Sequence, residues 1–297
     1  MKLKNIKQEF VDTLSGLYPL EEIQSFFSLL SEAYLGLSRI EIALQPKKEI
    51  TEENSEKFNK AILRLKQFEP IQYIIGETEF YGLPFFVNKE VLIPRPETEE
   101  LVDWIVKENI ENREERKDLL TTNEESKTIL DIGTGSGCIA ISLSHNLPDV
   151  SVLALDISEN ALQTAKQNAK RNKEAVNFIK ADVLNIDEGF FKEEFDVIVS
   201  NPPYVRELEK SQIEPNVIKF EPATALFVKD DDPLLFYRKI AQLSQEYLKP
   251  DGSLFFEINE YLSKELIIML NSEGFKDVVL KKDIFGKARM IKCRRDE

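Results

Sequence analysis

The sequence predicts an α/β protein built on a doubly wound, mainly parallel sheet, preceded by a small helical bundle and a β-hairpin linker. Four apolar, strand-like runs lie at 128–132, 152–156, 176–180 and 195–200, and segments of helical spacing separate them. Such alternation is typical of a parallel sheet covered by helices. A glycine-rich turn follows the first run, and residues 1–68 contain no convincing strand.

Apolar residues at helical spacing dominate the first part of the chain. Phe10, Leu14 and Leu17 share one helix face, and groups within 23–30 and 58–65 repeat the pattern. We therefore expect a separate helical bundle at the start of the chain.

A linker is expected between this bundle and the sheet. The runs 71–76 and 80–87 alternate and contain glycines, which predicts a β-hairpin. Pro94 and Pro96 argue against regular structure until a helix begins near Glu97.

The rest of the chain continues the alternation of helices and strands. The charged segment from Glu108 to Lys127 is expected to be a solvated helix end and a surface loop. The later elements are expected to be a helix at 232–248, a turn at 249–252, a strand at 253–258, a helix at 262–270, and an antiparallel hairpin of 278–282 with 288–292. Three domains are therefore expected, over residues 1–70, 71–96 and 97–297.

The glycine-rich turn is the first candidate for ligand binding. Gly133, Gly135 and Gly137 allow a tight turn and the close approach of a ligand to the backbone. Cys138 stands where a dinucleotide-binding fingerprint would have its third glycine. The spacing, preceded by Asp131, instead resembles motif I of S-adenosylmethionine-dependent methyltransferases. This resemblance implies that S-adenosylmethionine is bound by Gly133, Thr134, Gly135, Ser136 and Gly137.

Acidic residues follow the next two strands. Asp156 lies close to the spacing at which a carboxylate binds ribose hydroxyls, although it could instead cap the helix that begins beside Ser158. Asp182 would suit an adenine amino group and Val183 the adenine face, whereas acids are also common in loops after strands. We expect Asp156, Asp182 and Val183 to bind the cofactor.

Asn201-Pro202-Pro203-Tyr204 follows the fourth strand. Prolines continue neither a sheet nor a helix, so the chain must leave the strand in a fixed extended turn. The Asn201 oxygen and the Pro202 carbonyl could accept both hydrogens of a planar NH2 group, with the Tyr204 ring beside it. Such a clamp would position an amide or nucleobase nitrogen for methyl transfer without a strong base.

We therefore expect the catalytic and substrate-binding residues to be Asn201, Pro202, Pro203 and Tyr204, with Asn201 also touching the cofactor. The alternative for this motif alone is a plain Pro-Pro loop after a strand. The position of the other candidates decides between the two, because ligands of doubly wound sheets bind beyond the carboxyl ends of the strands. The glycine turn, both acids and Asn201 each follow a strand, which predicts one shared site.

Composition limits the partners. The 297 residues carry 39 Lys and Arg against 53 Asp and Glu, a net charge of −14. This balance disfavours non-specific nucleic-acid binding and suits a basic protein partner better. Two cysteines, Cys138 and Cys293, and a single His145 offer no metal-ligand spacing and no His-based triad. The absence of a signal peptide or apolar membrane span predicts a cytoplasmic protein without membrane contact.

The most specific signal lies in the linker. The run Ile93-Pro94-Arg95-Pro96-Glu97-Thr98-Glu99 closely resembles the linker of peptide chain release factor N5-glutamine methyltransferases, the PrmC/HemK family. The glycine turn, Asp156, the Asn-Pro-Pro-Tyr motif, Phe220-Glu221-Pro222 and Ala225-Leu226 follow in the family's order. The resemblance covers nearly the whole chain.

The resemblance implies a fold, a reaction and a partner. The fold would be the seven-stranded, Rossmann-like methyltransferase sheet. The enzyme would move a methyl group from S-adenosylmethionine to the side-chain amide of the glutamine in the Gly-Gly-Gln motif of class 1 release factors. The helical bundle would dock the release factor.

The resemblance does not settle the roles of four further residues. Arg95, Glu97 and Thr98 would border the cofactor pocket, or serve the linker structurally. Asn259, followed by Glu260, stands where the family usually has a glycine. The role of the loop after the fifth strand is therefore open.

Two other functions fit part of the pattern. A nucleic-acid amino-methyltransferase would use the same clamp on a flipped base. It predicts a basic groove and a target-recognition domain, and the sequence shows neither. A non-catalytic module that kept the fold is disfavoured by the intact glycine turn and the intact Asn-Pro-Pro-Tyr motif.

Overall fold

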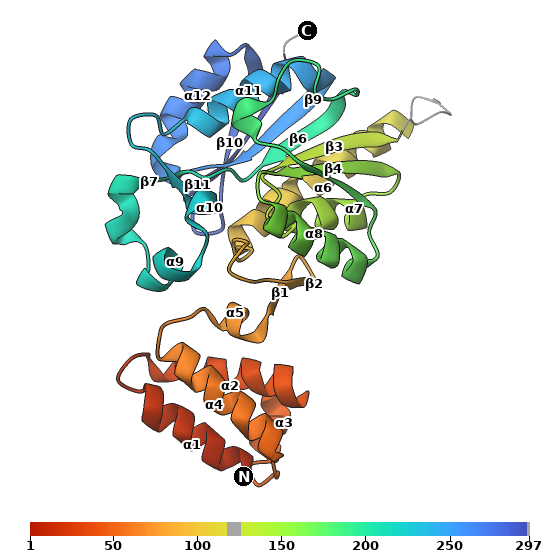
Figure 1. Ribbon diagram of the computed structural model, residues 1–297. Helices are drawn as coiled ribbons and strands as arrows, with labels where there is room; N and C mark the ends of the chain where they lie inside the picture. The colour runs from red at the N-terminus through yellow and green to blue at the C-terminus, as the bar shows by residue number, and fades with distance from the viewer. Residues whose placement is uncertain (118–125, 296–297) are drawn as a thin grey trace. The chain divides into compact units, whose positions relative to one another are not determined.

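The computed structural model of the chain describes residues 1–117 and 126–295 (Figure 1). The chain divides into two compact units, of which the first comprises Met1–Gly76 with Glu214–Phe220 and the second Glu77–Ile213 with Glu221–Glu297. The three expected domains stay a prediction. Of the segment expected to be a helix end and surface loop, residues 118–125 lie outside the described part of the chain.

The first unit is helical, as predicted. Its helices are α1 (Leu3–Leu14), α2 (Leu20–Leu35), α3 (Arg39–Leu44), α4 (Glu52–Leu65) and α5 (Ile71–Ile75), joined by the short α9 (Pro215–Phe220) from later in the chain. Phe10, Phe27 and Phe58 are fully buried at its centre, with ring centroids 5.5–6.0 Å apart. Apolar spacing therefore identified Phe10 and Leu14 in the core, whereas Leu17, expected on the same helix face, lies beyond the end of α1 and is exposed.

The expected hairpin is only partly right. Residues Ile71–Ile75 form helix α5, which ends at Gly76 in the left-handed conformation, a common way for a helix to stop. The hairpin comprises β1 (Glu77–Phe80) and β2 (Leu83–Phe86) alone. Its two-residue turn, Tyr81-Gly82, has positive φ at both residues, which matches the twist of paired strands.

The second unit contains the predicted seven-stranded sheet, in the order β10-β11-β9-β6-β3-β4-β5. The strands are β3 (Lys127–Ile132), β4 (Val150–Asp156), β5 (Val176–Lys180), β6 (Phe195–Ser200), β9 (Leu248–Glu257), β10 (Phe275–Lys282) and β11 (Ala288–Arg295). Six of them run in the same direction, and β11 runs antiparallel to both of its neighbours, β9 and β10. The predicted closing antiparallel pair is confirmed.

Helices cover both faces of this sheet (Figure 1). One face packs against α6 (Pro96–Lys117), α7 (Cys138–Asn146) and α8 (Glu159–Asn172), and the other against α11 (Leu235–Tyr247) and α12 (Ser263–Ser272). Successive residues of β3 point to opposite faces of the sheet. Ile129 lies in the core with α6 and α7, and Leu130 lies in the core with α11 and α12. A strand buried on both faces must be apolar throughout, which explains the continuous run in the sequence.

Residues 249–252 differ from their expected turn. They form a bulge inside β9, because the partners of β6 change from Leu248 opposite Phe195 to Ser253 opposite Val197. Asp251 adopts a positive φ of 64° there. The Pro-Asp-Gly sequence predicted a local reversal, but the chain stays in the sheet on both sides of it.

The sheet reverses its direction of growth between β3 and β6. The chain proceeds outward from β3 to β4 and β5 and then returns to β6 on the other side of β3. Ile132 and Ser200, the last residues of β3 and β6, are register partners, and the Ser200 hydroxyl donates to the Ile132 carbonyl at 2.7 Å. The glycine turn and the Asn-Pro-Pro-Tyr motif therefore begin side by side at the switch point, where doubly wound folds bind ligands.

The remaining short elements follow β5, β6 and β9. They are the 3-10 turns η1 (Val183–Asn185), η2 (Glu207–Gln212) and η3 (Glu260–Leu262), helix α10 (Ala223–Leu226), and the strand pair β7 (Val205–Arg206) and β8 (Phe227–Val228). Most of them surround the carboxyl edge of the sheet.

Candidate active site

A cavity of about 410 Å³ lies at the carboxyl edge of the sheet, beside the switch point. The predicted residues that line it are Gly133, Gly135, Asp156, Asp182, Val183, Asn201, Pro202 and Pro203. The structure therefore brings together groups from four separate strand ends in one space.

The three glycines of the turn have different tasks, although all have positive φ. A Cβ added to Gly133 or Gly135 would meet nothing within 4 Å, and both residues line the cavity. A Cβ on Gly137 would lie 2.9 Å from Ile141 Cδ1 and 3.1 Å from Ala165 Cβ. Gly133 and Gly135 thus leave room for a ligand, whereas Gly137 allows α7 to pack against α8.

Thr134 and Ser136 do not line the cavity, and neither does Gly137. Thr134 is buried and donates to Asp131 Oδ2 at 2.6 Å, and the Ser136 carbonyl accepts from Asn168 Nδ2 at 2.9 Å. These contacts shape the turn. Direct cofactor binding by the three residues stays a prediction.

Asp131 lies under the turn and is completely buried. Among the residues described, its Oδ1 has no hydrogen-bond partner. Burial raises the pKa of this carboxyl to about 7, against which the Thr134 hydrogen bond acts. Asp131 is therefore an unusual acid whose charge is costly in the folded state.

Asp156 lies at the end of β4, and Ser158, not Asp156, is the N-cap of α8, because the Ser158 side chain accepts from the Ala161 amide. Asp156 Oδ1 accepts from the Ser158 amide at 2.9 Å, and its Oδ2 accepts from the Gly135 amide at 2.8 Å. Each carboxylate oxygen keeps a further lone pair, and the group lines the cavity. Burial raises its pKa, while these backbone hydrogen bonds lower it. The arrangement can accept hydrogen bonds from the hydroxyls of a ribose.

Asp182 and Val183 both reach the cavity wall. The carboxylate of Asp182 is also engaged locally, because Oδ1 accepts from the Leu184 amide at 3.0 Å and Oδ2 from Asn185 Nδ2 at 2.6 Å. It thereby caps the turn η1. The case for adenine contact is consequently stronger for the apolar Val183 than for Asp182.

A second, smaller cavity of about 50 Å³ adjoins the first. Asn201 and Pro202 line both cavities, whereas Tyr204 and Glu257 line only the smaller one and Pro203 only the larger. The start of the Asn-Pro-Pro-Tyr motif therefore stands between two spaces, one on the side of the glycine turn and one on the side of Tyr204.

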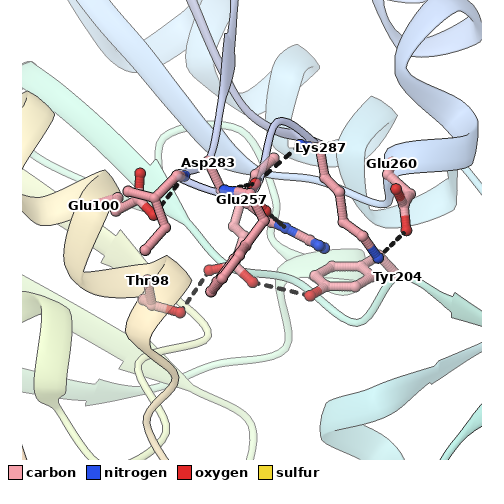
Figure 2. A network of polar contacts seen from close by, with 10 residues as sticks. Thr98, Glu100, Tyr204, Glu257, Glu260, Asp283 and Lys287 are labelled. Carbon is pink, nitrogen blue, oxygen red and sulfur yellow. Dashed lines mark hydrogen bonds and ion pairs between the residues drawn. The ribbon is translucent and has the colours of Figure 1, made fainter.

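A buried polar network holds this motif (Figure 2). The Tyr204 hydroxyl donates to Glu257 Oε1 at 2.9 Å, and the Thr98 hydroxyl donates to Glu257 Oε2 at 2.5 Å. Asn201 Nδ2 in turn donates to Thr98 Oγ1 at 3.2 Å. Burial and the charge of Glu257 raise the pKa of Tyr204 well above its ordinary value. Tyr204 is thus a neutral, anchored ring.

Asn259, the departure from the family pattern, belongs to the same support. Its Nδ2 lies 3.0 Å from the Tyr204 carbonyl and 2.9 Å from Glu209 Oε2, and its Oδ1 accepts from the Tyr261 amide at 3.0 Å. The residue fixes the backbone of the motif to the loop after β9. This gives the open loop a structural role in the chain.

None of the linker residues with open roles lines the larger cavity. Arg95 lines the smaller one and pairs with Glu221, with Nη2 and Oε1 2.5 Å apart. Thr98 belongs to the buried network, and Glu97 borders a separate surface hollow. Of the two roles left open for these residues, the contacts of Arg95 and Thr98 favour the structural one.

Sequence reasoning missed Glu257 and gave Glu221 no role. Both are buried carboxylates, and Glu257 lies inside the otherwise apolar run Phe255-Phe256-Glu257-Ile258. Because a buried charge needs partners, an acid in such a run is the signal that could have found it.

Cys138, Cys293 and His145 line neither of the two cavities. Cys138 and Cys293 are buried and free, and burial raises the pKa of the Cys138 thiol to about 12. His145 lies in the last turn of α7, with Nδ1 2.9 Å from Glu174 Oε1. Within residues 1–117 and 126–295, no group of His, Cys, Asp and Glu is arranged to hold a metal ion. No helix in that part of the chain is long and apolar enough to cross a membrane.

Known protein families resemble both parts of this chain. Residues 8–76 match the PrmC N-terminal domain, and residues 117–224 match the methyltransferase small domain. The release factor glutamine methyltransferase of Flavobacterium psychrophilum is 49% identical over 98% of this chain and 99% of its own. That of Bacteroides thetaiotaomicron is 45% identical, over 95% and 96% respectively.

A solved methyltransferase from Pyrococcus furiosus shares the fold alone, with a TM-score of 0.50 and 17% identity over 83% of this chain and all of that one. Fold, cavity and matched domains thus define a methyltransferase. The identity over nearly the full length is more specific. The chain belongs to the family of release factor glutamine methyltransferases, and the resemblance noted in the sequence is confirmed.

Proposed function

We propose that the protein transfers a methyl group from S-adenosylmethionine to the side-chain amide nitrogen of the glutamine in the Gly-Gly-Gln motif of class 1 peptide chain release factors. One observation carries the proposal. The two adjoining cavities share Asn201 and Pro202 as a common wall. A donor on one side and an acceptor on the other would meet at these residues.

The larger cavity fits S-adenosylmethionine. The open space at Gly133 and Gly135 suits a ligand against the backbone, and the free lone pairs of Asp156 suit ribose hydroxyls. When bound there, the cofactor would supply a methyl group on a positively charged sulfur, which a neutral nucleophile can attack.

The clamp would act on the acceptor by positioning it. The Asn201 side-chain oxygen and the Pro202 carbonyl would accept hydrogen bonds from the glutamine NH2 group, which turns the nitrogen lone pair toward the methyl group. These dipoles also stabilise the positive charge that develops on nitrogen as the new bond forms. The nitrogen then loses a proton to water.

The first unit would dock the release factor. The family match over residues 8–76 supports this assignment, and the net charge of −14 suits a basic partner. The cytoplasmic location expected from the sequence stays a prediction.

The test is to incubate the protein with radiolabelled S-adenosylmethionine and a class 1 release factor. Parallel reactions contain the release factor with its Gly-Gly-Gln glutamine replaced by alanine, duplex DNA, and structured RNA. We expect label only on the unmodified release factor. Label on nucleic acid, or equal label on the alanine variant, would contradict the proposal.

A further inference from the structure

The side-chain amide of Asn201 has an oxygen end and a nitrogen end with opposite hydrogen-bonding character. Only the orientation that points the oxygen toward the glutamine suits the proposed acceptor. The Asn201 oxygen accepts hydrogen bonds, and the Asn201 NH2 group donates them. A glutamine NH2 needs the oxygen. The structure shows what sets this orientation, at a residue that lies outside the larger cavity.

The decisive contacts run from Glu257 through Thr98 to Asn201. The Glu257 carboxylate receives a hydroxyl donor on each oxygen, from Thr98 at 2.5 Å and from Tyr204 at 2.9 Å (Figure 2). An ionised carboxylate is an acceptor only. The single proton of the Thr98 hydroxyl is therefore committed to Glu257.

The Thr98 oxygen can then act only as a hydrogen-bond acceptor toward other groups. The atom of Asn201 that faces it at 3.2 Å must be the donor Nδ2 and cannot be Oδ1. This conclusion follows from proton counting along the chain of hydrogen bonds. The amide oxygen of Asn201 must then lie on the opposite side, and no hydrogen bond to it is found in the part of the chain that the structure describes.

The geometry indicates an ionised Glu257, because each of its two oxygens receives a hydroxyl donor. Burial, with the charge of Glu97, raises the pKa of this carboxyl, and the hydrogen bonds from Thr98 and Tyr204 and the positive charge of Arg289 act against that rise. Thr98 and Glu257 are only 2% and 1% exposed, so water does not compete for their hydrogen bonds. A buried network in which every polar group has a hydrogen-bond partner keeps its side chains in one orientation.

We propose that Thr98 is a positioning residue that fixes the Asn201 amide with its oxygen toward the acceptor, and thereby makes the site select a carboxamide over a carboxylate. A glutamate side chain would present lone pairs to the lone pairs of the Asn201 oxygen. Without Thr98 the amide can rotate and offer its NH2 group to such a carboxylate. This proposal rests on the proposed function, because it takes glutamine as the acceptor.

The experiment compares the wild type with Thr98→Val, which keeps the shape but lacks the hydroxyl, and with Thr98→Ser, which restores it. For each protein, kcat/KM is measured with the release factor. The dissociation constants of that release factor and of its Gln→Glu variant are measured in the presence of S-adenosylhomocysteine. Melting temperature and cofactor affinity report on folding.

For Thr98→Val we expect kcat/KM to fall roughly tenfold or more, and the preference for glutamine over glutamate to fall by a similar factor, because one oriented hydrogen bond is lost. Thr98→Ser should recover both, with cofactor affinity unchanged throughout. If Thr98→Val does not fold, Thr98→Ala makes the same comparison.

Unchanged kcat/KM and preference in the variant would overturn the proposal. A loss of activity with an unchanged preference would also overturn it, since a purely structural role predicts that result. Absence of methylation by the wild type would instead refute the proposed function, so the two failures are distinguishable.

Discussion

The cofactor side and the acceptor side of the site are built from contacts of very different sequence separation. On the cofactor side, Thr134 donates to Asp131, only 3 residues away. On the acceptor side, Thr98 contacts Asn201 across 103 residues and Glu257 across 159. The first side depends on the glycine turn and on Asp156, which accepts from the Gly135 amide across 21 residues. The second depends on side chains that meet only when the sheet and α6 are assembled.

This difference predicts how each side responds to substitution. Changes on the cofactor side should alter ligand affinity or local stability, whereas changes on the acceptor side should alter the reaction while the fold and cofactor binding persist. The following substitutions test the contrast, beginning with the largest expected effect.

Asn201→Ala should abolish most methyl transfer. The change removes one of the two acceptors for the glutamine NH2 group, and losses of roughly 100-fold or more are typical when an oriented polar group is deleted from such a site. Cofactor affinity should stay within about fivefold, since one hydrogen bond is worth about 1 kcal/mol. Single-turnover methylation and calorimetric titration of the cofactor separate the two. Normal transfer by the variant would refute the clamp.

Gly137→Ala and Gly135→Ala should separate packing from ligand binding within one turn. At Gly137 the new Cβ would press on Ile141 and Ala165, so we expect a loss of about 2–4 kcal/mol in the free energy of unfolding. At Gly135 the Cβ enters open space in the cavity. We expect about 1 kcal/mol of backbone strain there, with a larger loss of cofactor affinity.

Urea unfolding and cofactor titration of both glycine variants provide the comparison. The opposite pattern, with Gly135→Ala as the less stable protein and Gly137→Ala as the weaker binder, would show that the tasks of the two glycines are assigned wrongly.

Asp156→Ala should weaken cofactor binding by about 1–3 kcal/mol, because a charged hydrogen-bond acceptor is lost. Asp182→Ala is a matched control on the same cavity wall. Its carboxylate already caps the turn η1, so a smaller loss of affinity is expected. The ribose assignment fails if the cofactor dissociation constant of the Asp156 variant equals that of the wild type.

Asp131→Asn should change how stability depends on pH. The pKa of Asp131 rises from 3.8 in its ordinary environment to about 7 in the fold. Between these values the folded chain holds a proton that the unfolded chain has lost, so this carboxyl makes the wild type less stable as pH rises from 4 to 7. The asparagine variant lacks this contribution.

The stability of the wild type relative to the Asp131→Asn variant should therefore fall by at most about 1.4 kcal/mol for each pH unit between 4 and 7 and level off above that range. Unfolding of both proteins at several pH values measures it. A constant difference across the range would show that Asp131 is ionised in the fold as readily as in the unfolded chain.

The parts of the molecule that the sequence predicted correctly are those that local patterns determine. The strand runs, the glycine turn and the helical spacing around Phe10, Phe27 and Phe58 are each visible within a short segment. Residues 71–75 were misjudged because Ile-Gln-Tyr-Ile-Ile suits a strand by composition. The segment instead forms a short helix that begins after Pro70 and ends at Gly76, which is in the left-handed conformation.

The role of Thr98 could not be found in this way. Nothing in Pro96-Glu97-Thr98-Glu99 indicates that the hydroxyl turns inward while Glu97 faces a surface hollow. Family resemblance marked the segment but did not say what it contacts. Only the packing of α6 beside β9 brings Thr98 to Glu257, and no local spacing encodes that meeting.

The pairing of Ile132 with Ser200 has a consequence for how this architecture can change its substrate. The loops after β3 and β6 are attached to neighbouring strands of the same sheet. The sequence of one loop can therefore be changed while the strand that carries the other loop keeps its position. An engineered exchange of the loop after β6, with its contacts in α6, would install a new acceptor beside an unaltered donor site. The pair of β3 and β6 thus forms a constant scaffold on which different acceptor-binding loops can be placed.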